Sequence, residues 1–316
     1  MKVAVTDDRF KHYQEEEEVL SKCGAELFVC PECKGEEILE YIVDADGLLV
    51  NQFKLTGDII SRLDKCRIIS RYGIGYDNVD IEAARAKGIP VSRVPDYCFD
   101  EVGEHALGMI LALSRNLTLI DRKVRAGEWN IHPDTDMPRL AGSTLGIIGY
   151  GGTGQALHRK AFGIGFGRIL LCDPVLDKKE NEKLYAEVSS FDTVIKESDY
   201  ISVHVPYNRQ NDHLIDLSVL EKMKKTAVLI NTSRGRVVDN DALFKALKEK
   251  RIRGAGIDVF DFEPPRQKEK FSGLENLVVS DHCAYYSNSS ISDLKISAAL
   301  NIADVFMGKP PRFPVT

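Results

Sequence analysis

Residues 145–154 read LGIIGYGGTG, and this short stretch decides the fold class. The apolar run LGII predicts a buried strand, and the segment 155–162 that follows predicts a helix. Between them, Gly149, Gly151 and Gly154 form the pattern GxGxxG. Glycines there permit a tight turn, and they let a phosphate group approach free N–H groups at the start of the helix. The pattern is weak alone, so its specificity rests on the strand and the helix around it.

An acidic residue ends the next predicted strand, as this type of turn requires. Asp173 closes the run ILLCD, about 20 positions after the last glycine, where an acid binds the ribose hydroxyls of a dinucleotide. A carboxylate at this position repels a 2′-phosphate. The sequence therefore predicts a site for NAD rather than NADP.

The same alternation of strand and helix extends over the whole chain. Apolar runs at 2–7, 25–30, 46–51, 67–73 and 89–95 form a first series of predicted strands, with helical segments between them. A helix is expected over 102–116, and a second series follows at 145–150, 168–173, 200–205, 227–232, 254–259 and 276–281. A last helix is expected over 292–307. This order predicts an α/β protein with two doubly wound parallel sheets.

Composition excludes several classes of protein. The 316 residues carry a net charge of −6 and are 43% hydrophobic, which excludes a disordered chain and argues against nucleic acid as a partner. No apolar run approaches the length of about 20 residues that spans a membrane. Asp7 and Asp8 interrupt any signal peptide, and seven cysteines fit reduced thiols. A cytoplasmic protein without a membrane partner is expected.

Metal binding is not expected from the pattern of ligating residues. Cys30 and Cys33 form a lone CxxC, which a metal or redox site would need to supplement with further ligands. No other cluster with metal-ligand spacing is present in the sequence. Among the histidines, His12 and His158 are expected on the surface, and His105 is a candidate for an interface.

Three ionisable residues follow the last three predicted strands. Arg234 comes after the strand at 227–232, Glu263 after that at 254–259, and His282 after that at 276–281. Because parallel strands present their carboxyl ends at one edge of the sheet, these residues are expected beside the dinucleotide. An arginine binds and polarises a 2-oxo acid, a histidine exchanges the hydroxyl proton, and a carboxylate orients the imidazole. The combination suits hydride transfer.

The order of motifs resembles the D-isomer-specific 2-hydroxyacid dehydrogenases. The resemblance covers the stretches 71–116, 140–157, 203–215, 227–243 and 256–265, including AVLINTSRGRVVDNDAL and GIDVFDFEPP. It implies that Arg234, Glu263 and His282 are catalytic. It also implies that a Rossmann NAD-binding domain, residues 99–286, is inserted into a flavodoxin-like substrate-binding domain made of residues 1–98 and 287–316.

The resemblance also implies further contacts with the cofactor and the substrate. Asp258 would contact the nicotinamide carboxamide, and the segment at His204 would border the adenine. The implied cofactor-binding set is Gly149, Gly151, Gly152, Thr153, Gly154, Asp173, His204, Val205, Pro206, Thr232, Ser233, Arg234, Asp258 and His282. The implied substrate-binding set is Asn51, Gln52, Ile74, Gly75, Arg234 and Tyr285, with backbone N–H groups of Ile74 and Gly75 holding the substrate carboxylate. A homodimer through the helix 102–116 is expected.

Departures from the family pattern leave alternatives open. Gly152 stands where many members carry an arginine, so backbone amides would hold the pyrophosphate. Asp281 replaces a proline before His282, and it either raises the pKa of the imidazole or faces solvent. Tyr285 either lines the substrate pocket or packs the hinge.

The function itself also has alternatives. The run HCAYYS at 282–287 is similar to the branch that contains C-terminal-binding proteins, which leaves an NAD(H)-sensing interaction protein as the alternative to a dehydrogenase. Oxidation of a small anion such as formate or phosphite is a third possibility.

Overall fold

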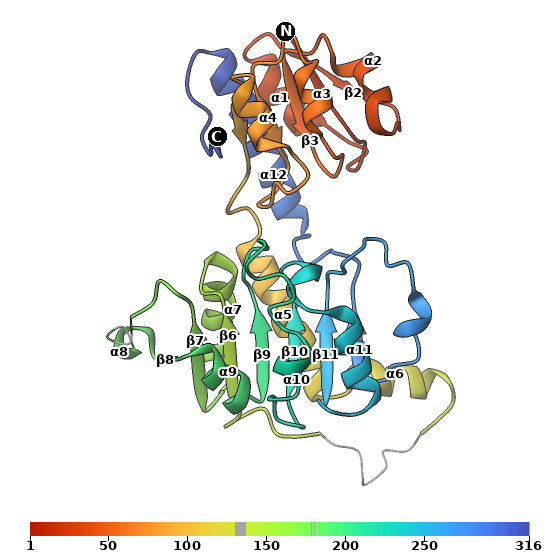
Figure 1. Cartoon of the computed structure of the whole chain (residues 1–316), viewed down its shortest axis with the longest axis vertical. Helices are drawn as coiled ribbons and strands as arrows, with labels where there is room; N and C mark the ends of the chain where they lie inside the picture. Colours follow the sequence, from red (N-terminus) through yellow and green to blue (C-terminus); the bar gives the residue numbers. More distant parts are fainter. Residues whose placement is uncertain (130–136, 178, 180, 316) are drawn as a thin grey trace. The chain divides into compact units, whose positions relative to one another are not determined.

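The computed structural model describes residues 1–129, 137–177, 179 and 181–315. The chain divides into two compact units (Figure 1). The first unit comprises residues 1–97 and 287–316, and the second comprises residues 98–286. Each unit has its own parallel sheet with helices on both faces, so the predicted fold class is confirmed.

The first unit is built on a sheet that, in the described part of the chain, has five parallel strands in the order β2-β1-β3-β4-β5. Alternate residues of each strand enter two separate cores, as the period of a strand requires. Ala4 and Leu48 pack toward one core, whereas Val3, Val5 and Leu49 pack toward the other. The strands are β1 (Lys2–Val5), β2 (Glu26–Val29), β3 (Gly47–Val50), β4 (Ile69–Arg71) and β5 (Val91–Ser92).

The helices of the first unit cover both faces of this sheet. One face packs against short helices, and the other packs against α1 and the carboxyl-terminal helix α12. The helices are α1 (Gln14–Ser21), the 3-10 turn η1 (Gly35–Ile38), α2 (Leu39–Ile42), α3 (Gly57–Ser61), α4 (Ile81–Ala86) and α12 (Asn288–Phe306). The last helix begins four residues before the predicted start, because Ser287 and Ser290 form a capping box.

The second unit contains, among the described residues, a sheet of seven parallel strands in the order β12-β11-β10-β9-β6-β7-β8. Six of them were predicted. The seventh, β8, has only two residues, too few to show a period of two. The strands are β6 (Thr144–Ile148), β7 (Arg168–Cys172), β8 (Glu187–Val188), β9 (Tyr200–Val203), β10 (Val228–Asn231), β11 (Gly254–Ile257) and β12 (Leu277–Val279).

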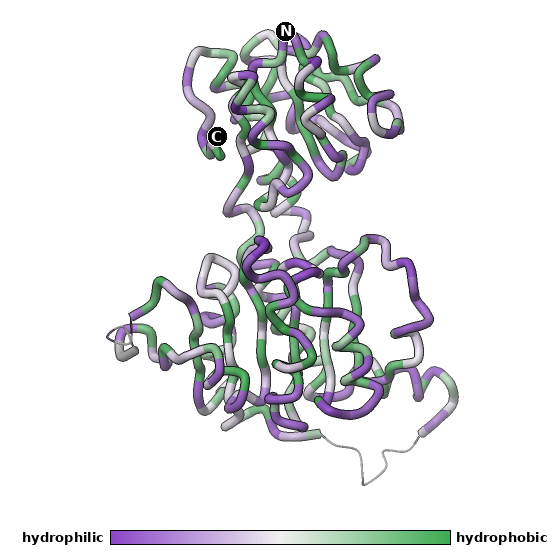
Figure 2. Tube along the Cα trace, viewed as in Figure 1, coloured by the Kyte–Doolittle hydropathy of each residue, from purple (hydrophilic) through white to green (hydrophobic). Residues whose placement is uncertain are grey.

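Two layers of helices enclose the second sheet, and apolar residues run along its strands (Figure 2). Helix α5 packs so closely on α7 that a side chain at Gly103 would overlap Ala156. The helices are α5 (Phe99–Ser114), α6 (Leu117–Arg125), α7 (Gly152–Phe162), α8 (Asn181–Leu184), α9 (Phe191–Glu197), α10 (Leu217–Leu220) and α11 (Asn240–Lys248), with 3-10 turns η3 (Gly235–Val237) and η4 (Lys268–Lys270). Of the helices in the described ranges, none is both long and apolar enough to cross a membrane.

Candidate active site

The glycine-rich turn connects β6 to α7 at the carboxyl edge of the second sheet. Gly149 has φ 91°, and a Cβ there would lie 2.7 Å from the carbonyl carbon of His204. A Cβ on Gly154 would overlap the carbonyl oxygen of Gly149. Helix α7 begins at Gly152, within the motif, and so exposes the N–H groups of its first turn. The turn thus forms a cradle that fits a pyrophosphate.

Gly152 is glycine for a steric reason. A Cβ at this position would overlap the ring of Phe99, the first residue of α5. An arginine, which many family members carry here, would need a different residue at 99. Backbone amides and the N-terminal dipole of α7 are therefore what this turn offers to a phosphate.

Asp173 follows β7 and faces the same turn. Its Oδ2 accepts a hydrogen bond from the backbone N–H of Tyr150 at 2.7 Å, and its Oδ1 accepts one from Val175 at 3.0 Å. Each oxygen keeps a further lone pair for a ribose hydroxyl. The position fits the role predicted for it.

Two buried polar atoms at this edge have no hydrogen-bond partner among the described residues. They are Nδ1 of His204, directly after β9, and Oγ1 of Thr232, directly after β10. Nε2 of His204 pairs with Ser202 Oγ at 2.8 Å, and burial lowers the pKa of this histidine to about 4. Buried polar groups normally find a partner. Both atoms therefore fit a site whose ligand supplies the missing hydrogen bonds.

The turn that carries Arg234 is organised by Asn231, the last residue of β10. Its Oδ1 accepts hydrogen bonds from the N–H and the hydroxyl of Ser233, and its Nδ2 donates to the carbonyl of Arg234 at 3.0 Å. Gly235 follows because a Cβ there would overlap the backbone of Phe260. This turn holds Arg234 at the edge where the strands end.

Glu263 and His282 form the central pair of the site. Glu263 Oε2 lies 2.5 Å from His282 Nδ1, and its Oε1 accepts the backbone N–H of Phe260 at 3.0 Å. Burial raises the pKa of Glu263, but the hydrogen bond to His282 and the nearby charge of Arg234 outweigh it, and the pKa stands below its ordinary value. Because the ionised carboxylate accepts from Nδ1–H, Nε2 is the nitrogen left to exchange a proton.

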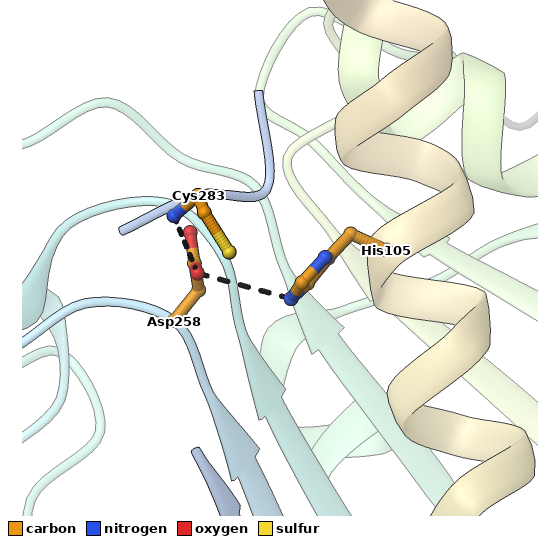
Figure 3. Close-up of side chains that lie close together, drawn as sticks. All are labelled: His105, Asp258 and Cys283. Carbon is orange, nitrogen blue, oxygen red and sulfur yellow. Dashed lines mark hydrogen bonds and ion pairs between the residues drawn. The ribbon is translucent and has the colours of Figure 1, made fainter. Parts of the chain in front are cut away.

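The loop that carries His282 is held by Asp258, the residue after β11. The Asp258 carboxylate accepts hydrogen bonds from Ser280 Oγ at 2.5 Å and Ala284 N at 3.0 Å. It also accepts one from Cys283 N at 2.9 Å (Figure 3). Its backbone carbonyl accepts the N–H of His282 at 2.8 Å. His282 has φ 56°, a left-handed conformation that is uncommon for residues other than glycine. Asp258 thus stabilises a strained loop, a role not predicted for it.

Sequence reasoning missed two residues of this arrangement. His105, on α5, contacts Ser280 Oγ through Nε2 at 2.8 Å, and Ser280 in turn donates to Asp258. His105 lies more than 150 positions before its partners, so no local spacing could reveal it. Asp281 is exposed, which favours the second of the two alternatives given for it, that it faces solvent.

One prediction about histidines is wrong. His158 was expected on the surface, but it is 7% exposed and its Nδ1 pairs with the hydroxyl of Tyr150 at 2.7 Å. It lies on the inner side of α7, where it supports the glycine-rich turn through Tyr150. His12 is exposed, as expected.

The residues predicted to bind substrate in the first unit lie at the carboxyl ends of neighbouring strands. Asn51 and Gln52 follow β3, and Ile74 and Gly75 follow β4. The Asp7 carboxylate, for which no role at the site was predicted, accepts the backbone N–H groups of Asn51 at 3.1 Å and Gln52 at 2.7 Å. Asp7 therefore fixes the turn on which both residues stand.

The glycine cradle, Asp173 and the trio of Arg234, Glu263 and His282 define a dinucleotide-dependent hydride-transfer enzyme as the class of protein. The family described as D-isomer specific 2-hydroxyacid dehydrogenase, NAD binding domain, matches residues 107–284. The chain belongs to this family. It is an NAD-dependent oxidoreductase that acts on the CH–OH group of 2-hydroxy acids.

Relatives of known name agree with this class. A glyoxylate reductase of Thermococcus litoralis is 38% identical over 282 residues, which cover 87% of this chain and 84% of the relative. A D-3-phosphoglycerate dehydrogenase of Methanocaldococcus jannaschii is 36% identical, over 89% of this chain and 53% of the relative. The crystal structure of D-lactate dehydrogenase from Aquifex aeolicus, complexed with NAD and lactic acid, has a TM-score of 0.86 at 26% identity and covers 98% of this chain and 96% of that one.

Proposed function

We propose that this chain reduces a small 2-oxo acid, with glyoxylate as the first substrate to test. The observation that carries the proposal is the hydrogen bond of 2.5 Å between His282 and Glu263, at the same sheet edge as Arg234. The names of the relatives support the choice of glyoxylate, since several of them, 36% to 39% identical, are glyoxylate reductases.

Each residue of the trio has one task in this reaction. NADH supplies a hydride when bound. Arg234 binds the substrate carboxylate and polarises the adjacent carbonyl group. Nε2 of His282 gives its proton to the carbonyl oxygen, and Glu263 holds the ring and stabilises its protonated form. The backbone N–H groups of Ile74 and Gly75 are proposed to bind the substrate carboxylate as well.

Substrate choice is proposed to depend on Tyr285. Its ring packs edge-on against His282, with 6.3 Å between the ring centroids. A tyrosine so close to the acid/base limits the side chain that the substrate can carry. Tyr285→Ala is expected to shift preference toward larger 2-oxo acids, and an unchanged preference would leave Tyr285 as a packing residue.

The decisive assay is NADH oxidation over a panel of glyoxylate, pyruvate, hydroxypyruvate and larger 2-oxo acids. Arg234→Ala is expected to lower kcat/KM by about 100-fold or more, because it removes a charged, bidentate contact with the reacting anion. Arg236→Ala is the matched control, since Arg236 is exposed and pairs with Asp212 instead. Turnover that Arg234→Ala leaves unchanged would refute the mechanism.

The NAD(H)-sensing alternative is not favoured, because the relatives described above are named for enzymatic activities. The similarity of the run HCAYYS to the branch containing C-terminal-binding proteins stays a prediction. NADH binding without turnover on any member of the panel would revive this alternative.

The expected homodimer and cytoplasmic location also stay predictions. In support of a dimer, α6 buries none of its own side chains within the chain and exposes Leu117 and Val124 beside α5. Gel filtration of the wild type and of Leu117→Glu tests the dimer, and a wild-type monomer at micromolar concentration would exclude it.

A further inference from the structure

Three potential metal ligands lie close together next to His282. His105 comes from α5, Asp258 follows β11, and Cys283 follows His282 (Figure 3). Their ligating atoms all lie within 4.8 Å of one another, and His105 Nε2 is 3.8 Å from Asp258 Oδ1. Across the described ranges, no other three histidine, cysteine or acidic side chains meet this way. All three belong to the second unit.

The spacing of these atoms suits a tetrahedral cation. With bonds of about 2.0–2.3 Å to nitrogen, oxygen and sulfur, ligand atoms around Zn²⁺ lie about 3.3–3.6 Å apart. The three side chains therefore need to move together by about 1 Å or less. A donor set of imidazole, carboxylate and thiolate selects Zn²⁺ or Co²⁺ over Mg²⁺ and Ca²⁺, which prefer oxygen ligands.

Burial and charge also favour a cation at this point. Asp258 is 1% exposed and supplies a buried negative charge, whereas the side chain of His105 is 28% exposed and Cys283 is partly exposed. Solvent therefore reaches the cluster from one side, while the carboxylate lies at its inner end. This arrangement gives a cation both an entry path and a counter-charge.

A hydroxyl group now bridges two of the three ligands. Ser280 Oγ lies 2.8 Å from His105 Nε2 and donates a hydrogen bond to Asp258 Oδ1 at 2.5 Å. Since the hydroxyl proton goes to the carboxylate, Nε2 of His105 carries the proton of its own hydrogen bond to Ser280. A cation between the same two atoms would replace this bridge, with the imidazole proton shifting to Nδ1 and the thiol proton of Cys283 passing to solvent.

We propose that His105, Asp258 and Cys283 bind a thiophilic divalent cation such as Zn²⁺, and that the bound cation inhibits the enzyme. The inhibition rests on the proposed function, whereas the binding does not. Asp258 Oδ1 also accepts the N–H of Cys283, and the Asp258 carbonyl accepts the N–H of His282. A cation on Oδ1 competes with the hydrogen bonds from Ser280 and Cys283 that hold the loop, so it displaces the acid/base from its position beside Glu263.

Binding is tested with Co²⁺, whose bond to a thiolate gives a charge-transfer absorption band. The purified chain is titrated with Co²⁺ and then with Zn²⁺, which should bleach the band. Cys283→Ser should abolish the band, and His105→Asn should raise the half-saturating concentration at least about tenfold, since even the loss of a group that only supports a ligand weakens metal binding by about that factor. Ser280→Ala, which removes only the bridging hydroxyl group, should keep the absorption band.

The control addresses the other pair of thiols. Cys30 and Cys33 border a cavity of about 520 Å³ in the first unit and could hold cobalt themselves. Cys33→Ser should leave the band intact. A band that survives Cys283→Ser, or one that Cys33→Ser removes, overturns the proposed site.

Inhibition is measured separately, as NADH turnover against Zn²⁺ concentration. Cys283→Ser should raise the inhibitory concentration at least about tenfold, matching the binding data. Cobalt binding in a chain without turnover would refute the proposed function and keep the site. Turnover in a chain that binds no cobalt would keep the function and refute the site.

Discussion

Replacing Asp258 by Asn tests how the acid/base histidine is held. The carboxylate accepts three hydrogen bonds from residues 280, 283 and 284, and it is buried. Asparagine has nearly the same shape, so it creates no cavity, but it has one acceptor oxygen and one NH₂ group. If its oxygen faces Ser280 and Cys283, its NH₂ group faces the N–H of Ala284, and two donors then meet.

The cost follows from these contacts. A buried donor without an acceptor costs about 1–3 kcal/mol, and each of the two remaining bonds loses about 1 kcal/mol when its acceptor is no longer charged. The strain in the left-handed conformation of His282 is the same in both proteins and cancels in the comparison. The loss of about 3–5 kcal/mol lowers the equilibrium constant for holding His282 in position by about 150- to 5000-fold.

The assay is steady-state kinetics with the preferred 2-oxo acid, together with urea unfolding. Asp258→Asn should lower kcat by up to that factor, while Ser280→Ala, which removes one bond of the three, should lower it less than about tenfold. An unchanged kcat with a raised KM for NADH would instead support a contact between Asp258 and the nicotinamide carboxamide. Kinetics and stability both within twofold of wild type would refute the role of the carboxylate altogether.

Three further substitutions have expected outcomes. Gly154→Ala puts a Cβ into the carbonyl of Gly149 and should weaken NADH binding at least about tenfold in a fluorescence titration, whereas Gly163→Ala, at a position with room for a Cβ, should not. Burial lowers the pKa of His204 to about 4, so the folded state favours its neutral imidazole. The free energy of unfolding therefore includes up to about 3 kcal/mol from this group above pH 6.5, and it loses this amount as the pH falls toward 4. His204→Asn should flatten the pH dependence of urea unfolding in that window, and an equally steep dependence would contradict the assignment. Lys295→Met leaves the buried Glu16 on α1 without its cation, since Lys295 Nζ lies 3.4 Å from Glu16 Oε2 as well as 2.6 Å from the partly exposed Glu15. It should destabilise the chain by about 3 kcal/mol in the same assay, and a loss below about 1 kcal/mol would show that Lys295 is not needed there.

Much of the site was predictable because a parallel sheet converts sequence order into spatial order. Arg234, Glu263 and His282 follow β10, β11 and β12, which are neighbours in the sheet. Finding the ends of the strands was therefore enough to predict that these side chains share one edge. The glycine motif was predictable for a related reason, because its steric demands are local to one turn.

The support for the site was not predictable in the same way. His105 reaches Ser280 from a helix on the face of the sheet, and that contact depends on how α5 packs rather than on any strand order. The contact of Asp258 with the nicotinamide carboxamide was implied by the family resemblance and stays a prediction. Within the chain, Asp258 accepts hydrogen bonds from the Ser280 hydroxyl and from the backbone N–H groups of Cys283 and Ala284, and backbone groups carry no sequence signature.

The departure at Gly152 shows how packing and the cofactor site are coupled. The family pattern offers an arginine here, and loss of a cation from a phosphate site would by itself weaken binding. In this chain the volume of that side chain is taken by Phe99, which starts α5 against the first turn of α7. The aromatic ring excludes any Cβ at 152, so the groups that this turn offers to a phosphate are the backbone N–H groups in the first turn of α7. The missing arginine is therefore a consequence of how α5 packs on α7, and the amides at the helix N-terminus are left to bind the phosphate in its place.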